Sequence, residues 1–394
     1  MGIARPEGRR QRRSCMAGGG AIGAFAVALG LLGAAPVAAS AQTAQVATGP
    51  APLAGSSTIG VTEIPISFQV QNVNRSKVPC PADGATYTVR GHLVAPASAA
   101  VNASTVTLYL HGLGLGEFFW NFSDFGNAPG YHYADTLAQA GQTSVIVDRL
   151  GYGASDKPPG TQICLGSQAD IAHQEVQDLR AGNYTLGNAQ SPQHFSKVVL
   201  AGHSVGGLIT QIEAYSFGGV DAIVNMDFSD QGMSALTMAD FAQWQAACSA
   251  GGTTVTDAGG PGGYATFAQA PQVHPTFFSQ PDPAIEGFVL ARMVRDPCGD
   301  QTSFMAGVSA DMANLGQVHV PVLLLFGDKD ALFPVPDGVA QMDRFTGSPS
   351  VTYAQVPGLP HAVTLEPAHL LVAAEVEHWL VTYVETGQAP RGAV

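Results

Sequence analysis

The sequence predicts an α/β protein in which helices cover both faces of one mostly parallel sheet. Short apolar runs rich in β-branched residues alternate with helical patterns along most of the chain. Several runs, such as Val198–Leu200 and Val322–Phe326, contain no polar residue, as expected for strands buried on both faces. The chain has 394 residues, of which 46% are hydrophobic and only 12% charged, so it has ample material for a buried core.

Strands and helices are expected to follow one another in order. The expected strands are Thr86–Val94, Thr105–Leu110, Thr143–Asp148, Lys197–Ala201, Ala222–Met226, Val320–Phe326 and Val351–Val356. The helical patterns are Tyr133–Ala140, Gln168–Arg180, Gly206–Tyr215, Asp337–Phe345 and Ala368–Val384. The stretch 230–318 interrupts this order, because it is long and mixes a helical pattern, Leu236–Ala247, with glycine-rich loops. We therefore expect a core of residues 61–229 and 319–394, with a lid of residues 230–318 inserted into it.

The N-terminus carries the features of a secretory signal. A basic head at residues 5–13 precedes an uncharged run at 17–35, and small residues at 39–41 predict cleavage after Ala41. A retained membrane anchor remains the alternative, because the uncharged run is nearly long enough to span a bilayer. The paired arginines also permit twin-arginine export. Residues 42–60 are expected to form a flexible leader, and the mature protein to be secreted, extracellular or periplasmic, without stable membrane insertion.

The charge balance argues against nucleic acid as a partner. The chain holds 17 Lys and Arg against 30 Asp and Glu, a formal net charge of −13. Binding to phosphate backbones depends on clustered basic residues that release counterions, and no such cluster follows the signal segment.

The cysteines agree with export. Cys15 lies in the signal segment, and an even number remains, as expected for disulfides in an oxidising compartment. We prefer the pairs Cys248–Cys298 and Cys80–Cys164, since the first would close the lid on itself; buried free thiols are the alternative. No C-x-x-C spacing occurs, so neither a zinc site nor a cofactor is expected.

The most specific motif is G-x-S-x-G at residues 202–206, between an expected strand and an expected helix. Gly202 and Gly206 allow close backbone passage at a sharp strand-to-helix turn. Ser204, at the tip, would lie near a helix N-terminus, where backbone N–H groups stabilise negative charge. The motif predicts a nucleophilic Ser204; a tight turn with an idle serine is the alternative.

A serine nucleophile needs a base and a carboxylate that orients it. His361 lies in the loop after the last expected strand and is predicted to be the base. Asp330, in the turn after residues 322–326, is predicted to be the carboxylate, while Asp328 caps that turn. Asp227 and Asp230 remain alternatives for the carboxylate.

A glycine-rich loop, residues 111–116, follows the expected strand Thr105–Leu110. It lacks the G-K-S/T of a phosphate-binding loop. We expect the loop to aim the backbone N–H of Leu113 at the reacting oxygen, with the N–H of Val205 as the second donor of an oxyanion hole. His111 is expected to be structural.

The order Ser204, Asp330 and His361, the His111-Gly112 loop before them and the segment Asp148–Asp156 together resemble the α/β-hydrolase fold superfamily. The resemblance covers about residues 85–385 apart from the lid. It implies an eight-stranded, mostly parallel sheet, with the catalytic side chains on loops at its C-terminal edge and a lid over the pocket. Related enzymes that cleave haloalkanes and epoxides carry an aspartate where this chain has Ser204, so those activities are disfavoured.

These parts suit acyl transfer to water, so the sequence predicts hydrolysis of carboxylic esters through an acyl-Ser204 intermediate. A lipase, a thioesterase or an aminopeptidase would use the same parts, and a non-catalytic binding relative is the alternative of another class. The expected partner is a small-molecule ester with an apolar group. The residues expected to receive that group are Phe118, Phe119, Trp120, Phe277, Phe278, Phe288 and Met293.

Overall fold

The computed structural model describes residues 60–98, 104–122, 130–269 and 271–387. The expected signal segment and nearly all of the expected leader lie outside these residues and stay predictions. No helix within the described residues is long and apolar enough to cross a membrane.

One central sheet organises the described residues, and its strand order is β11-β10-β7-β6-β3-β4-β2-β1-β5. Neighbouring strands from β11 to β4 are parallel, whereas β2, β1 and β5 join antiparallel. The bounds are β1 Val61–Gln71, β2 Thr86–Pro96, β3 Thr105–Leu110, β4 Ser144–Asp148, β5 Thr185–Leu186, β6 Lys197–His203, β7 Ala222–Met226, β10 Val322–Gly327 and β11 Val351–Val356. The predicted fold class, a mostly parallel sheet flanked by helices, is confirmed.

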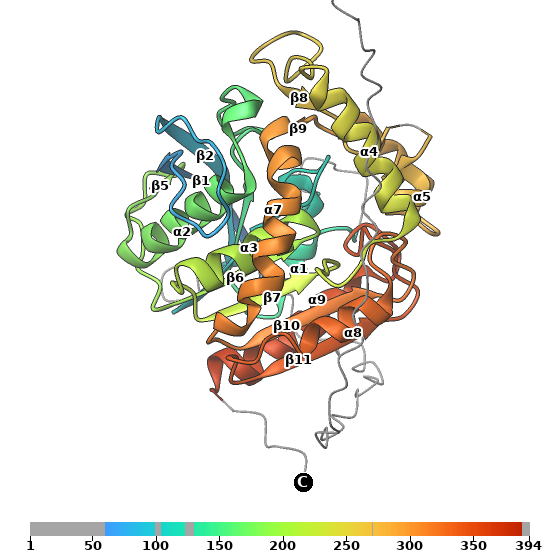
Figure 1. Cartoon of the computed structure of the whole chain (residues 1–394). Coiled ribbons are helices and arrows are strands. Elements are labelled where there is room, and N and C mark those ends of the chain that lie inside the picture. Colours follow the sequence, from blue (N-terminus) through green and yellow to red (C-terminus); the bar gives the residue numbers. More distant parts are fainter. Residues whose placement is uncertain (1–59, 99–103, 123–129, 270, 388–394) are drawn as a thin grey trace, which may run out of the picture. The chain divides into compact units, whose positions relative to one another are not determined.

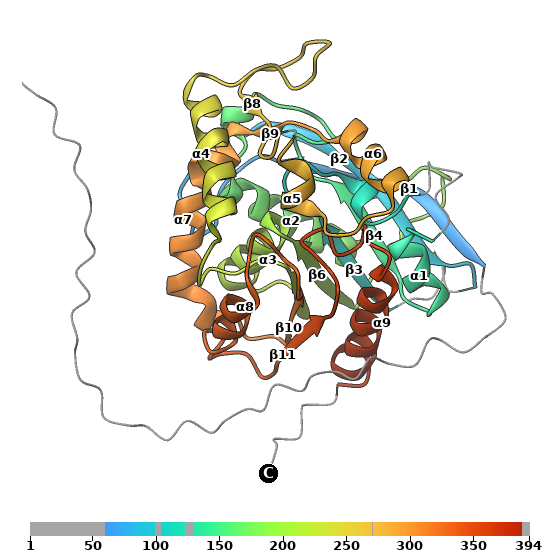
Figure 2. The same cartoon turned by 90° about the vertical axis from the view of Figure 1, so that its right-hand side faces the viewer.

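Helices lie on both faces of this sheet (Figures 1 and 2), with α2, α3 and α7 on one side and α1 and α9 on the other. Their bounds are α1 Tyr133–Gln139, α2 Leu165–Ala181, α3 Val205–Ser216, α7 Cys298–Asn314, α8 Val335–Met342 and α9 His369–Trp379. Parallel strands covered in this way are buried on both faces, and every residue of β10 is buried. The apolar runs in the sequence reflect this burial.

The sheet has nine strands within the described residues, one more than the eight that the family resemblance implies. The additional strand, β5, has only two residues and pairs with β1, so its sequence carries too little pattern to predict it. β1 itself was not among the expected strands, although Ile64, Ile66, Phe68 and Val70 are buried on alternate positions. Its alternation marks a strand near the sheet edge with one buried face.

The expected lid segment contains α4 Ala235–Ser249, α5 Val273–Phe277, α6 Pro283–Arg292 and a small sheet of β8 Tyr264–Ala265 with β9 Asp296–Pro297. Its last helix, α7, packs against α2 and α3, since Gly307 lies against Leu165 and Leu208. The segment thus ends as part of the helical layer over the sheet, while the division into core and lid remains our prediction.

Both preferred cysteine pairs lie at disulfide distance. The Sγ atoms are 2.02 Å apart in Cys80–Cys164 and 2.07 Å apart in Cys248–Cys298. The first pair ties the segment between β1 and β2 to the start of α2, and the second ties α4 to the start of α7. The second link therefore lies within the expected lid segment.

Candidate active site

Ser204 lies at the turn between β6 and α3. Its backbone has φ 55° and ψ −125°, a left-handed φ that a non-glycine residue rarely adopts. A Cβ on Gly202 would lie 2.1 Å from the carbonyl oxygen of Gly206, and a Cβ on Gly206 would lie 2.2 Å from that of Leu110. Only glycine fits at either position, so the motif builds the sharp turn that the sequence predicts.

His361 lies in the loop after β11 and is completely buried. Its Nδ1 is 3.0 Å from Oδ2 of Asp330, in the turn after β10. Asp330 Oδ1 accepts hydrogen bonds from the N–H groups of Leu332 (2.7 Å) and Phe333 (3.2 Å), which fix the carboxylate. With Nδ1–H donating to Asp330, His361 Nε2 carries a lone pair, and it has no partner among the described residues.

The other carboxylates considered for the third role have other partners. Asp328 accepts the N–H of Gly358 at 2.6 Å and caps the turn. Asp230 accepts a hydrogen bond from the side chain of Gln231. Asp227, at the end of β7, accepts the N–H of Gly327 at 2.8 Å and lies beside Asp330. Burial and the adjacent Asp330 raise the pKa of Asp227 well above its ordinary value, which favours its protonated form.

The glycine-rich loop after β3 lies against the serine turn. A Cβ on Gly112 would lie 3.0 Å from the Cβ of Ser204. The carbonyl of Gly112 accepts a hydrogen bond from Nδ1 of His111 at 2.8 Å, while Nε2 of His111 accepts the N–H of Arg149 at 3.1 Å. Burial and Arg149 lower the pKa of His111 well below its ordinary value. The ring is therefore neutral and holds the loop, in line with a structural role.

The two N–H groups predicted to form an oxyanion hole belong to residues next to Gly112 and Ser204, whose Cβ positions lie against each other. Leu113 follows Gly112 in the loop, and Val205 is the first residue of α3. Neither N–H has an acceptor among the described residues, as is usual for the first turn of a helix. Both groups are thus available to a ligand; their catalytic role remains a prediction.

One residue of the loop environment has no signal in the sequence. Asp296, in β9, is completely buried and accepts a hydrogen bond from the N–H of Gly114 at 2.7 Å. The two residues are 182 positions apart in the sequence. It belongs to no motif and lies in a segment whose fold the sequence leaves open. Only the long-range packing of the chain brings it to the glycine-rich loop.

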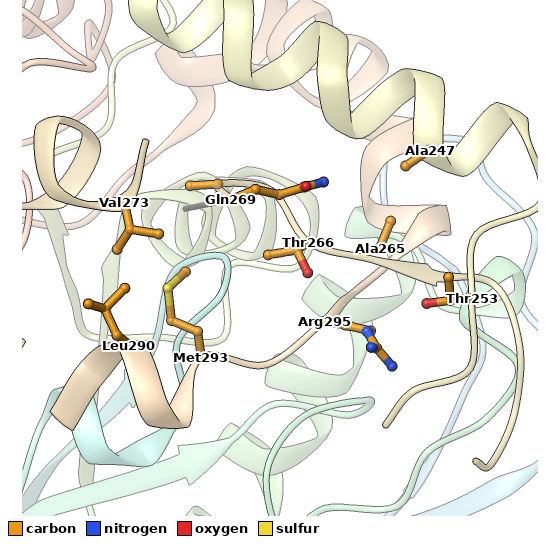
Figure 3. Close-up of a pocket in the computed structure, with 10 residues that line it drawn as sticks. Ala247, Thr253, Ala265, Thr266, Gln269, Val273, Leu290, Met293 and Arg295 are labelled. Atoms are coloured by element: carbon orange, nitrogen blue, oxygen red, sulfur yellow. The ribbon is translucent and has the colours of Figure 1, made fainter. Parts of the chain in front are cut away.

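A pocket of about 410 Å³ lies near the same loop (Figure 3). Met293 lines it, and a Cβ on Gly114 would lie 2.7 Å from the Cε of Met293, so the pocket adjoins the loop. In Figure 3, Val273, Leu290 and Met293 lie together at one end, away from Arg295. The lining residues are Ala247, Thr253, Ala265, Thr266, Ala268, Gln269, Val273, Leu290, Met293 and Arg295.

The apolar residues expected near the substrate divide into two groups. Phe119 stacks on His203 with ring centroids 4.2 Å apart, and Trp120 packs on Tyr109 at 4.9 Å, so both are core residues. The ring of Phe277 lies 6.0 Å from that of His361. The remaining aromatic residues are Phe278, which is buried near Phe277, and Phe118 and Phe288, which both contact Phe122. Phe277 therefore lies beside His361, and Met293 lies beside Gly114 of the glycine-rich loop.

Away from this site, Glu63, His92 and Glu117 bring potential metal-ligand atoms within 4.8 Å of one another. His92 pairs with Glu117, and its Nδ1 lies 4.0 Å from a carboxylate oxygen of Glu63. These contacts describe the group as an ion-pair cluster, and we keep the prediction that no metal is needed.

The sheet, the serine turn and the loop around it together define the class of protein. The chain matches the family described as Alpha/beta hydrolase family over residues 108–374, and it belongs to that family. The family resemblance that the sequence carries is confirmed.

Individual relatives are more distant. A Monoacylglycerol lipase of Mycolicibacterium smegmatis is 33% identical over 104 residues, which are 24% of this chain and 37% of that protein. This match spans little more than a third of the curated relative's length.

Solved structures share the fold. A thermophilic esterase of Thermogutta terrifontis superposes with a TM-score of 0.52 at 14% identity, covering 80% of this chain and 98% of the esterase. The monoacylglycerol lipase of Paleococcus ferrophilus gives a TM-score of 0.50 at 19% identity, covering 71% and 94% of the two chains. At these identities the likeness concerns the fold alone.

Proposed function

We propose that the chain is a secreted serine hydrolase that cleaves carboxylic esters through an acyl-Ser204 intermediate. The observation that carries this proposal is the state of His361, whose Nδ1 is engaged by Asp330 while its buried Nε2 is free. A neutral imidazole held in this way has its basic nitrogen available for the proton of a serine hydroxyl. Ser204 lies in the same loop cluster, because His203 beside it donates from Nε2 to the carbonyl of His361 at 2.8 Å.

In the first half of the reaction, His361 Nε2 takes the proton of Ser204 Oγ as the oxygen attacks the ester carbonyl carbon. The negative charge that develops on the carbonyl oxygen is stabilised by the N–H groups of Leu113 and Val205. Asp330 stabilises the imidazolium that forms. When the C–O bond to the alcohol breaks, His361 returns the proton to the leaving oxygen, and the acyl group remains on Ser204.

In the second half, a water molecule gives a proton to His361 and attacks the acyl carbon. The second tetrahedral intermediate uses the same two N–H donors, and its collapse releases the acid and restores Ser204. The protein's own residues therefore account for each proton transfer.

An ester with an apolar group is the substrate class we propose. Its support is the pocket beside Gly114, in which Val273, Leu290 and Met293 gather at one end. The M. smegmatis relative is a monoacylglycerol lipase by name, which favours esters over thioesters or amides.

Export after cleavage following Ala41 completes the proposal. Two cysteine pairs at disulfide distance fit an oxidising compartment. N-terminal sequencing of the protein recovered outside the cytoplasm would test the cleavage site, and a retained residue before Ala41 would contradict it.

A fluorophosphonate probe and a series of aryl esters of graded acyl length test the activity. We expect covalent labelling of Ser204, identified by mass spectrometry of the labelled peptide, and turnover that rises with acyl length before it falls. A folded protein that neither reacts with the probe nor turns over any ester would instead be a non-catalytic binding relative.

A further inference from the structure

The segment between α6 and α7 holds the glycine-rich loop at a single residue. The N–H of Gly114 donates to Oδ1 of Asp296 at 2.7 Å, and its carbonyl accepts the N–H of Val294 at 3.1 Å. Gly114 has φ +68°, and a side chain there would meet Met293. Both hydrogen-bonding groups of this residue are thus bound by a segment about 180 positions later in the chain.

Asp296 bridges two parts of the molecule through one carboxylate. Its Oδ1 binds the loop, while Oδ2 accepts the N–H of Phe267 at 3.1 Å. The side chain is completely buried, and burial raises its pKa to about 7. The two N–H groups and Arg149 lower that pKa, whereas Asp300 raises it. Burial of a carboxylate costs desolvation free energy. The two oxygen atoms of Asp296 offset this cost by accepting hydrogen bonds from Gly114 and Phe267 in fixed directions.

The contact bears directly on Leu113. The peptide group before Leu113 is fixed by the hydrogen bond from His111 Nδ1 to the Gly112 carbonyl, and the peptide group after it carries the N–H that Asp296 binds. The Leu113 N–H lies in the same planar peptide group as the Gly112 carbonyl, and holding the Gly114 N–H restricts rotation about the Leu113 backbone, so the two hydrogen bonds together fix the direction of the Leu113 N–H. Ser204 closes the other side of the loop, since it lies against Gly112.

The anchor itself is held firmly. Asp296 pairs with Ala265 in the small β8–β9 sheet, and Cys298, two residues later, lies at disulfide distance from Cys248 of α4. A displacement of this segment would therefore be transmitted to Gly114 rather than absorbed between them.

We infer that Asp296 is a positioning residue for the oxyanion hole, through which the lid segment sets the direction of the Leu113 N–H. This inference rests on the proposed acyl-serine mechanism. The lid segment would then both cover the substrate and position an N–H group of the oxyanion hole. A donor that is misdirected weakens transition-state binding while leaving ground-state binding of the ester nearly unchanged.

The test compares Asp296→Asn and Asp296→Ala with the wild type by steady-state kinetics on an aryl ester. Deleting an oxyanion donor costs about 10²–10³ in kcat. Misdirecting one donor should cost less, about tenfold to hundredfold for Asp296→Ala, with KM within about threefold of the wild type. Asparagine retains one acceptor oxygen, so Asp296→Asn should recover part of the lost kcat.

A tetrahedral inhibitor supplies the readout that a loss of stability would not move. The affinity of an alkylboronic acid, whose adduct with serine places an oxygen in the oxyanion hole, should fall in parallel with kcat. Asp311→Asn is the matched control, because Asp311 is equally buried but accepts its hydrogen bond from Gln211 of α3 and not from the glycine-rich loop. We expect a much smaller loss of kcat than in either Asp296 variant, and an unchanged affinity for the boronic acid.

If Asp296→Ala does not fold, Val294→Pro removes the other contact to Gly114 without touching the carboxylate, and the same fall in kcat is expected. Wild-type kcat in either folded variant, or a rise in KM alone, overturns the inference and leaves the acyl-serine mechanism in place. A wild-type protein without ester turnover or fluorophosphonate labelling overturns the proposed function itself.

Discussion

The sheet and the lid segment place residues at the candidate site in different ways. The sheet presents Ser204, Asp330 and His361 on the loops that directly follow β6, β10 and β11. Because these strands are parallel, their C-terminal ends meet at one edge, and the three loops leave the sheet there. The lid segment instead reaches the site through Asp296 and Met293, by packing between parts distant in the sequence. Positions that follow from strand ends can be predicted from the sequence, whereas positions that follow from long-range packing cannot.

The largest expected effect tests the sheet side of this comparison. Ser204→Ala should abolish ester turnover, leaving about the 10³-fold acceleration over water that oxyanion binding alone provides. Ser350→Ala is the matched control, since Ser350 has the same 7% exposure as Ser204 and its buried hydroxyl has no partner among the described residues. Turnover and fluorophosphonate labelling of both variants, with melting temperatures, provide the measurement. Substantial activity in a folded Ser204→Ala variant would place the nucleophile elsewhere.

The second prediction separates the two buried carboxylates. Asp330→Asn should lower kcat by several orders of magnitude, because the imidazole loses the acceptor that orients Nδ1–H. Asp227→Asn should cost far less, since this side chain contacts Gly327 and Asp330 rather than the imidazole. Steady-state kinetics on one ester decides the assignment. Near-normal activity in Asp330→Asn together with a large loss in Asp227→Asn would make Asp227 the orienting acid.

The extent to which the sequence predicts the molecule follows the same division. The strand β3 and the strands β6, β7, β10 and β11 have apolar runs whose length and flanking turns identify them. The G-x-S-x-G motif fixes its own local geometry, because Gly202 and Gly206 have no room for a side chain. These local features are sufficient to predict the fold class and to nominate the candidate triad.

The features that the sequence did not predict depend on pairing across long distances. The strand β1 is an exception, since its alternating apolar residues indicate a strand although it is not among the expected ones, whereas β5 is too short to carry a pattern. Asp227 accepts the N–H of Gly327, whereas Asp330 pairs with His361. Only the three-dimensional structure distinguishes these two carboxylates. Asp296 lies outside every motif, so its contact with Gly114 could not be anticipated. Sequence reasoning also assigned Phe119 and Trp120 to the pocket, although both pack in the core.

The third prediction contrasts the two cysteine pairs. Cys248 and Cys298 are 50 positions apart, and a cross-link closing a loop of that length contributes about 4 kcal/mol in the chain-entropy model. Replacing both by serine should loosen the lid segment first, with faster proteolysis within residues 250–265 and altered selectivity for bulky esters. The sheet should remain folded, as monitored by far-ultraviolet circular dichroism.

The matched variant replaces Cys80 and Cys164, which are 84 positions apart and join the β1–β2 connection to α2. Removal of this second cysteine pair should lower the melting temperature of the whole protein without selective cleavage at residues 250–265. Mass spectrometry of a non-reduced digest checks the premise, since a peptide joining Cys248 to Cys80 or Cys164 would refute the pairing. Equal cleavage patterns in both variants would refute the division between sheet and lid.

The smallest expected effect concerns pH and again contrasts the two regions. Glu175, on α2, is buried, and burial with the nearby Asp178 raises its pKa to about 8. An unfolded Glu titrates at about 4.3, so the folded state binds a proton more tightly, and its stability declines as pH rises from about 4 to about 8.

Glu175→Gln should therefore leave the free energy of unfolding nearly unchanged at pH 4 and raise it at pH 8.5 by up to a few kcal/mol. Urea denaturation at both pH values measures the difference, with the exposed carboxylate Asp343→Asn as control. Asp296→Asn tests the lid segment in the same way. Its gain in the free energy of unfolding should reach its full value at a lower pH than the gain of Glu175→Gln, because the pKa of Asp296 is raised only to about 7. An equal gain at pH 4 and 8.5 for Glu175→Gln would show that packing, and not the cost of a buried charge, sets the contribution of this residue. A gain confined to high pH in both variants would show that the helix α2, which covers the sheet, and the lid segment each carry a carboxylate whose ionisation opposes folding.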